Sequence, residues 1–95
     1  MDDLLHLLHS DGADELRLRV GQPPIIVLDG EEKLIEGPPL TTGDTEHLLW
    51  GITDTRQRRM FRERHAVEFL YKFRGRTNFV VRAKIEGEDV CIVVH

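Results

Sequence analysis

The chain has 95 residues, of which 40% are hydrophobic and 32% are charged, and its formal net charge is −4. This size and composition are typical of one globular domain, residues 1–95, and exclude a disordered or fibrous chain. No apolar run is long enough to span a membrane, and the acidic start Met1-Asp2-Asp3 is unlike the basic start of a secretory signal. The single cysteine, Cys91, cannot form an internal disulfide, so we expect a reducing, cytoplasmic location.

Charge is distributed unevenly along the sequence. Residues 1–55 contain 12 acidic and three basic residues, net −9, whereas residues 56–95 contain five acidic and ten basic residues, net +5. If the fold keeps these halves apart, head-to-tail contacts between copies of the chain are favoured electrostatically. If the fold brings them together, the charges pair within one molecule. The net negative charge weighs against nucleic acid as a partner.

The first third of the chain predicts one helix and three strands. Leucines at helical spacing predict a helix over Asp2–His9, which the aspartates at its start favour. Alternation of apolar and charged residues predicts a half-buried strand over Glu15–Val20. A short apolar strand over Ile25–Leu28 and a return strand over Glu31–Ile35 follow, joined by Asp29-Gly30, whose residues tolerate the positive φ of a two-residue hairpin.

The rest of the chain predicts two helices and then three strands. Thr41, with Asp44 three residues later, predicts the capped start of one helix, and Thr53-Asp54 predicts the start of a second that ends near Arg64. The strands cover Val67–Phe73, Asn78–Ile85 and Val90–Val94, and the apolar last strand suits a central position. The order is therefore α-βββ-αα-βββ, which is typical of an α+β fold with a mostly antiparallel sheet and helices packed on it.

Sequence motifs for catalysis and cofactor binding are missing. The sequence contains neither a GxxxxGK[ST] phosphate loop nor a GxGxxG motif. His6 and His9 have a spacing that can share a metal, but a zinc site needs three or four ligands in a closed set. Cys91 lies within the apolar last strand, where we expect an inert core residue. We therefore predict no catalytic, cofactor-binding or metal-binding residue, and a chain that is not an enzyme by itself.

The densest cluster of charge is basic and consists of Arg56, Arg58, Arg59, Arg62 and Arg64. A basic helix can bind nucleic acid or an acidic membrane surface. However, the aromatic residues beside it, Trp50 and Phe61, have the helical spacing of core residues. We therefore expect a solvated face or a protein contact, without nucleic acid and without membrane insertion.

The sequence resembles a known family, most clearly in one stretch near its start. The segment Ala13–Pro24, with its strand followed by Gly21-Gln22-Pro23-Pro24, resembles the start of the N-terminal domain of PilT-type ATPases, the pilus-retraction (twitching-motility) members of the type II/IV secretion ATPase superfamily. The resemblance covers essentially the whole chain. Further agreements are Asp29-Gly30, Gly37-Pro38-Pro39-Leu40-Thr41, Thr53-Asp54 with Arg56-Gln57-Arg58, and a strand beginning at Gly75-Arg76.

The resemblance implies a PAS-like domain with a curved antiparallel sheet and helices on one side. In these ATPases it precedes a RecA-like motor domain and packs against the motor domain of the neighbouring subunit in a hexameric ring. It implies a non-catalytic interaction or regulatory module whose partner is a protein, such as a type IV pilus or secretion motor component, or another copy of the chain. Two alternatives stay open: the N-terminal fragment of a longer hexameric motor ATPase, and a PAS-like sensor of small ligands.

Departures from the family pattern indicate a candidate interface. The family's histidine after the first leucine is Arg17 here, and its Arg-Phe-Arg-Val-Asn strand reads Asn78-Phe79-Val80-Val81-Arg82. The apolar positions are thus kept while the polar ones change. The candidate interface residues, from the strands, the first turn and the basic helix, are Arg17, Arg19, Gln22, Asn78, Val80, Arg82, Arg56 and Arg59.

Overall fold

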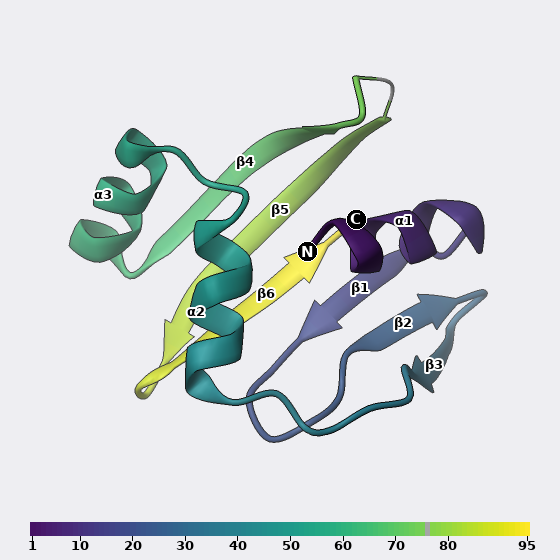
Figure 1. Ribbon diagram of the computed structural model, residues 1–95. Helices are drawn as coiled ribbons and strands as arrows, with labels where there is room; N and C mark the ends of the chain where they lie inside the picture. The colour runs from purple at the N-terminus through teal and green to yellow at the C-terminus, as the bar shows by residue number, and fades with distance from the viewer. Residues whose placement is uncertain (76) are drawn as a thin grey trace.

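The computed structural model, which describes residues 1–75 and 77–95, is built around a six-stranded sheet of order β3-β2-β1-β6-β5-β4 (Figure 1). All neighbouring strands are antiparallel. The elements are α1 (Asp2–Ser10), β1 (Glu15–Leu18), β2 (Ile25–Leu28), β3 (Glu31–Leu34), α2 (Thr42–Trp50), α3 (Thr55–Arg64), β4 (Ala66–Phe73), β5 (Thr77–Glu86) and β6 (Asp89–Val94). The predicted α+β class, the mostly antiparallel sheet and the order α-βββ-αα-βββ are confirmed. The strand start expected at Gly75-Arg76 includes Arg76, which lies outside the described residues.

The last strand of the chain lies in the middle of the sheet. β6 pairs with β5 through a tight hairpin and with β1 on its other side, in a register that sets Leu16 opposite Val94 and Leu18 opposite Ile92. As a result β1, β2 and β3 form one side of the sheet, and β4, β5 and β6 form the other. The central position predicted for this apolar strand is confirmed.

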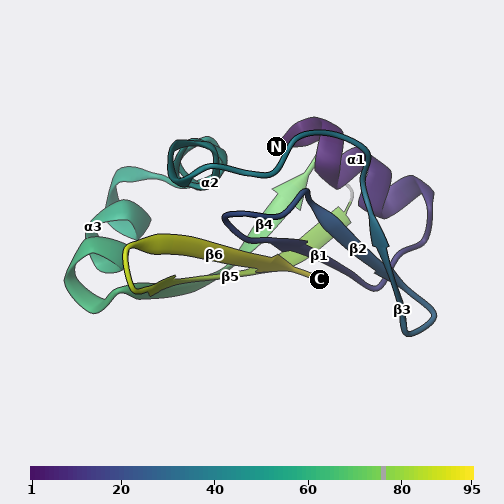
Figure 2. The same ribbon diagram turned by 90° about the horizontal axis from the view of Figure 1, so that it is seen from below.

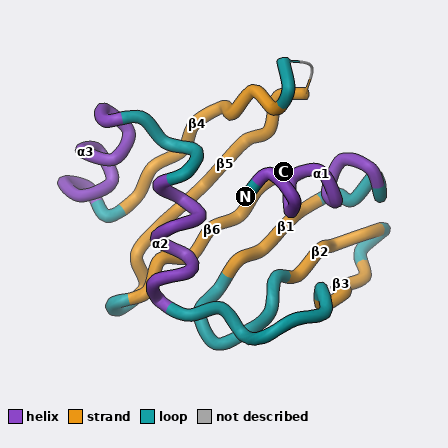
Figure 3. The backbone as a smooth tube through the Cα atoms, viewed as in Figure 1, coloured by secondary structure: helices purple, strands orange, loops and turns teal. Residues whose placement is uncertain are grey.

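The helices cover one face of the sheet. α1 packs over β1 and α2 over β6, while α3 lies beside the start of β4 at the edge of the sheet (Figures 1 and 2). A long loop, residues 35–41, carries the chain from the β3 edge to α2 (Figure 3). The opposite face of the sheet carries no helix from the described part of the chain.

The hydrophobic core fills the space between the sheet and the helices. Alternate residues of each strand point into it, because successive side chains of a strand face opposite sides. The hydrophobic side chains that solvent does not reach at all are Leu5, Leu16, Leu18, Leu49, Val81, Ile92 and Val94. Trp50 of α2 and Phe61 of α3 meet edge to face with ring centroids 5.9 Å apart, so both belong to the packed interior as expected.

The hairpin turn and the starts of α2 and α3 form at the residues that the sequence predicts. Asp29 and Gly30 have φ angles of 51° and 81°, which confirms the two-residue hairpin. Thr41 and Asp44 form a reciprocal capping box at α2, and Asp54 and Gln57 form one at α3. The hydrogen bonds that Asp44 accepts from Thr41 lower the pKa of its carboxyl, so this cap is complete at neutral pH and weakens only as acid protonates it.

Two strands are one or two residues shorter than predicted. β1 ends at Leu18 rather than Val20, because the chain turns at Gly21 and Val20 makes only one parallel bridge, to Leu40. β3 ends at Leu34 rather than Ile35. The Ile35 amide still donates to the Pro24 carbonyl at 2.8 Å, but Pro24 has no amide hydrogen with which to continue the ladder.

Arg58 differs from the other arginines of α3, because it is a structural residue. Its guanidinium donates to the carbonyl oxygens of Trp50 at 2.6 Å and Thr53 at 2.7 Å, and to the Thr53 hydroxyl at 3.1 Å. These bonds satisfy carbonyls at the end of α2 and fasten α3 to it.

We predict that Arg58→Met destabilises the fold by about 2 kcal/mol, because charge-assisted bonds to three acceptors are lost while the apolar stem is kept. Arg59→Met, one residue along the same helix and exposed, is the matched control and should change the free energy of unfolding by less than about 0.5 kcal/mol. Urea denaturation of both variants measures the difference. Equal effects of the two substitutions would contradict the structural role of Arg58.

Candidate interface on the helix-free face of the sheet

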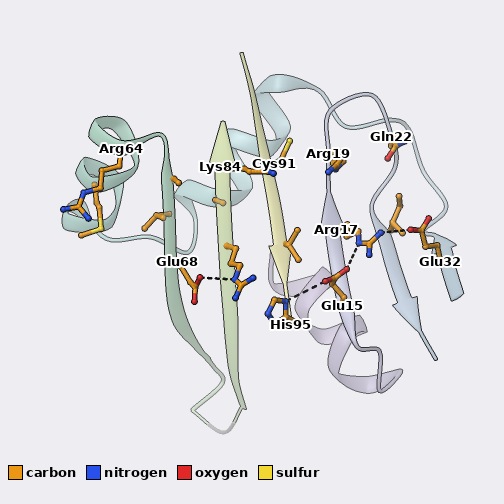
Figure 4. Close-up of a pocket in the computed structure, with 17 residues that line it drawn as sticks. Glu15, Arg17, Arg19, Gln22, Glu32, Arg64, Glu68, Lys84, Cys91 and His95 are labelled. Atoms are coloured by element: carbon orange, nitrogen blue, oxygen red, sulfur yellow. Dashed lines mark hydrogen bonds and ion pairs between the residues drawn. The ribbon is translucent and has the colours of Figure 1, made fainter. Parts of the chain in front are cut away.

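The face of the sheet opposite the helices, here called the open face, is hollowed. The hollow has a volume of about 980 Å³ and extends from Gln22 beside β1 to Met60 and Arg64 of α3 (Figure 4). Its floor is the middle of the sheet, where Arg17 of β1 lies opposite Val93 of β6 and Val93 lies opposite Arg82 of β5. The curvature of the sheet, visible in Figure 2, therefore gives this face a concave, partly charged surface.

The structure brings most of the candidate interface residues together. Arg17, Arg19, Gln22 and Arg82 line the hollow. Asn78 and Val80 alternate with the inward Phe79 and Val81 along β5, so they share the open face with Arg82. Arg56 and Arg59 are separate from this group, because they are exposed on α3 and do not line the hollow.

Arg17 is the most strongly paired cation of the open face. Its guanidinium contacts Glu15 on the same strand and donates to Glu32 of β3 at 2.5 Å. The hydrogen bond to Glu15, followed by the charge of Glu15, raises the pKa of Arg17 above its ordinary value. This side of the open face therefore carries fixed, mutually compensating charges that span β1, β2 and β3.

On β4 and β5, the other side of the open face, cations are also paired with neighbouring carboxylates. Arg82 of β5 lies 3.0 Å from Glu68, its direct partner on β4, and Lys84 lies 2.8 Å from Glu86 on its own strand. Among the described residues, Arg19 and Arg64 make no ion pair with a carboxylate, and both are exposed. Two unpaired cations thus flank the apolar centre of the hollow.

The centre of the hollow is apolar and comes from the two strands that the sequence marks as apolar, β2 and β6. Ile25 and Cys91 are 9% and 7% exposed, and Val93 is half-buried between Arg17 and Arg82. Cys91 is thus buried as predicted, but its side chain lies on the open face rather than under the helices. Burial first, and then the negative charge of Glu86, raise the pKa of its thiol.

Several open-face residues were missed by sequence analysis. Glu15, Glu32, Glu68, Lys84 and His95 all line the hollow. Strand alternation carried a usable signal, because it puts Glu15 on the side of Arg17 and Lys84 on the side of Arg82. No local signal could have found His95, whose Nδ1 lies 3.9 Å from a carboxylate oxygen of Glu15 through the pairing of the first and last strands.

The described residues contain neither a cluster of metal ligands nor a membrane-spanning helix. Within residues 1–75 and 77–95, no group of three or more His, Cys, Asp or Glu side chains is arranged to hold a metal ion. No helix of this part of the chain has both the length and the apolar character needed to cross a membrane.

Two solved structures share the fold of this chain. The pilus retraction motor PilT with bound ADP superimposes on the whole chain with a TM-score of 0.90 at 24% identity, and the match covers 28% of the PilT chain. The Legionella pneumophila ATPase DotB superimposes on the whole chain with a TM-score of 0.82 at 21% identity, over 27% of its own chain. The whole chain thus has the fold of about a quarter of each of these two larger chains.

Two curated proteins are related to this chain in sequence. The type IV pilus retraction ATPase PilT of Pseudomonas aeruginosa is 33% identical over 81 residues, which is 85% of this chain and 24% of PilT. The type IV pilus ATPase PilU of the same organism is 30% identical over 93 residues, which is 98% of this chain and 24% of PilU. No protein-family model matches the chain. The chain is a homologue of the N-terminal domain of PilT-type ATPases, and it spans about a quarter of the length of these relatives.

We predict that Cys91 reacts with iodoacetamide at pH 8 at least tenfold more slowly than an exposed cysteine, because a raised pKa leaves less thiolate and burial restricts access. The matched control is Ala66→Cys in a Cys91→Ala background, which puts an exposed thiol on the same face. Mass spectrometry of timed samples gives both rates. Equal rates would show that the centre of the open face opens readily to solvent.

Proposed function

We propose that this chain, as a single domain of residues 1–95, is a non-catalytic interaction module that binds a protein partner through the open face. The observation that carries the proposal is the composition of that face. It has an apolar centre at Cys91 and Val93, and it is flanked by Arg19 and Arg64, which have no carboxylate partner among the described residues. Protein interfaces commonly combine an apolar centre with arginines and a polar rim.

The apolar centre and the unpaired arginines of the open face define what surface a protein partner must present. A partner that presents apolar side chains to the centre and carboxylates to the two arginines would remove the apolar area from water and pair both cations. The charges of Arg17 and Arg82 are already compensated by Glu15, Glu32 and Glu68. These ion pairs contribute shape and orientation to the contact rather than long-range attraction.

The relatives indicate which partners to test first. They are named as type IV pilus ATPases, and the superimposed structures include a pilus retraction motor. We therefore propose a cytoplasmic partner from a type IV pilus or secretion motor, with assembly among copies of the chain as a further contact. Because the chain spans about a quarter of its relatives, the partner motor domain belongs either to the same longer polypeptide or to another subunit.

The alternative of a small-ligand sensor has less support from the interior. The space between the helices and the sheet is filled by aliphatic and aromatic side chains. Among the described residues the buried polar side chains are Thr45 and Thr53, and both donate to helix carbonyls, at 3.2 Å to Thr42 and at 3.0 Å to Leu49. The interior therefore offers a ligand no free polar group to orient it.

The binding proposal is tested with the purified PilT-type motor ATPase of the same organism as the probe. We expect the double variant Arg19→Glu and Arg64→Glu to weaken binding at least tenfold, because it reverses the two cations of the open face that have no carboxylate partner among the described residues. Arg56→Glu with Arg59→Glu makes the same change in net charge on α3 and should bind like the unchanged chain. Isothermal titration calorimetry measures both affinities. An equal loss in the two variants, or no binding by the unchanged chain, would refute the proposal.

The non-catalytic part of the proposal has its own test. We expect the purified chain to release phosphate from ATP no faster than a buffer blank, because the sequence lacks a phosphate-binding loop. A malachite green assay with magnesium and ATP measures the release, and the motor ATPase is the positive control. Phosphate release that rises in proportion to the concentration of the chain would overturn this part.

A further inference from the structure

The two edge strands of the sheet, β3 and β4, are not equally protected. β3 has four residues, and the chain after it runs into Pro38 and Pro39, which cannot donate to a ladder. β4 has eight residues and no proline, and it pairs with β5 in an unbroken register from Ala66 to Phe73. Native sheets commonly protect an edge by short strands, prolines or bulges. β4 therefore offers the longer and less protected edge.

Every second residue of β4 turns its main-chain groups away from the sheet. Val80 of β5 exchanges two backbone hydrogen bonds with His95, at 2.6 and 2.9 Å, so its polar groups face β6 rather than β4. Leu70 is the direct partner of Val80 in the register. Because bonded and non-bonded pairs alternate along an antiparallel ladder, the amide and carbonyl of Leu70 point outward, and so do those of Glu68 and Lys72.

The second half of β4 is open on its outer side. α3 lies beside the start of the strand and leaves the part that follows uncovered (Figure 1). Among the described residues, no backbone hydrogen bond joins the outward groups of Leu70 or Lys72 to another element. The Leu70 side chain is 69% exposed, and its neighbours Phe69 and Tyr71 are half-buried. A further strand along this half would pair the free main-chain groups and cover apolar area.

Free cations lie at the end of this exposed edge. Lys72 and Arg74 are exposed and make no ion pair with a carboxylate of the described residues. The Arg74 guanidinium lies 5.0 Å from the centroid of the Phe73 ring, which keeps it at the end of the strand. The charge of Glu68 is already compensated by Arg82, 3.0 Å away. The edge therefore favours a partner that carries carboxylates.

We propose that residues 69–73 of β4 bind an extended segment of a partner protein as a seventh strand, with apolar side chains beside Leu70 and Tyr71 and a carboxylate near Lys72 and Arg74. In this mode main-chain hydrogen bonds supply affinity, and alternate side chains supply specificity. The contact goes beyond the proposed open-face contact, because it depends on main-chain groups at the edge of the sheet. A second copy of the chain suits this edge less well. Antiparallel self-pairing about Leu70 would bring α3 of each copy against the end of β4 in the other.

Substitution of Leu70 by proline blocks the edge and tests the direction of its main-chain groups. Leu70→Pro should remain folded, because the amide that it removes points outward. Tyr71→Pro is the matched control, since it removes an amide that bonds to β5, and it should lower the melting temperature far more. Circular dichroism melts measure both, and equal losses would overturn the outward placement. Leu70→Glu is a second blocking variant, because it keeps the main chain but removes the apolar side chain and repels a carboxylate.

A phage-displayed library of random peptides of about 12 residues, selected on the purified chain, supplies the probes. We expect enriched peptides to combine β-branched or aromatic residues with aspartate or glutamate. Fluorescence anisotropy of the labelled peptides should show binding weakened about tenfold or more by Leu70→Pro and by Leu70→Glu. Arg19→Glu with Arg64→Glu, which alters the open face, should bind them like the unchanged chain. No enriched peptide, or peptides that depend on Arg19 and Arg64 rather than on Leu70, would overturn the proposal.

Methylation of the peptide amides distinguishes strand addition from other modes of binding. In an added strand every second amide of the peptide donates to β4, and the amides between them point away. We therefore expect N-methylation at alternate positions to weaken binding about tenfold or more, and at the positions between them much less. A pattern without this period of two would overturn the proposal. Sedimentation equilibrium of the chain alone tests the other occupant, because dimers that Leu70→Pro abolishes would show that a second copy takes the edge instead.

Discussion

The pairing of β1 with β6 is the contact on which the rest of the structure depends. It joins the two halves of the chain through Leu16, Leu18, Ile92 and Val94, and solvent reaches none of these side chains. Burying each of them contributes about 1.5–3 kcal/mol. Without this pairing the chain would consist of two separate three-stranded units, and α1 and α2 would have no common sheet to cover.

The same pairing defines the surfaces available for contact. By putting the helices over one face, it leaves Arg17, Val93 and Arg82 in one row across the other face. By putting the two halves side by side, it keeps the acidic and basic segments at opposite ends of the sheet.

The helices and strands were predictable from the sequence, because each depends on neighbouring residues. Alternation identified the inward residues of β4 and β5, and Thr41 with Asp44 marked the start of α2. The partner of β1 was not predictable, because pairing with β6 is a contact between opposite ends of the chain. Composition likewise could not distinguish Arg58 from Arg59, since only the folded chain shows that Arg58 faces the end of α2. Which face of the sheet the helices leave uncovered depends on the same long-range pairing. The sequence therefore indicated individual interface residues, but it did not show that most of them share one surface.

The central position of β6 also determines the order of events during synthesis. Within this domain β1 is made before the other five strands, and β6, which pairs with its inner edge, follows all of them. Until then Leu16 and Leu18 remain partly unprotected, and the many carboxylates of the first half help to keep that segment from aggregating. The final step closes a loop nearly as long as the domain, so a high contact order makes folding slow relative to a helical domain of this size.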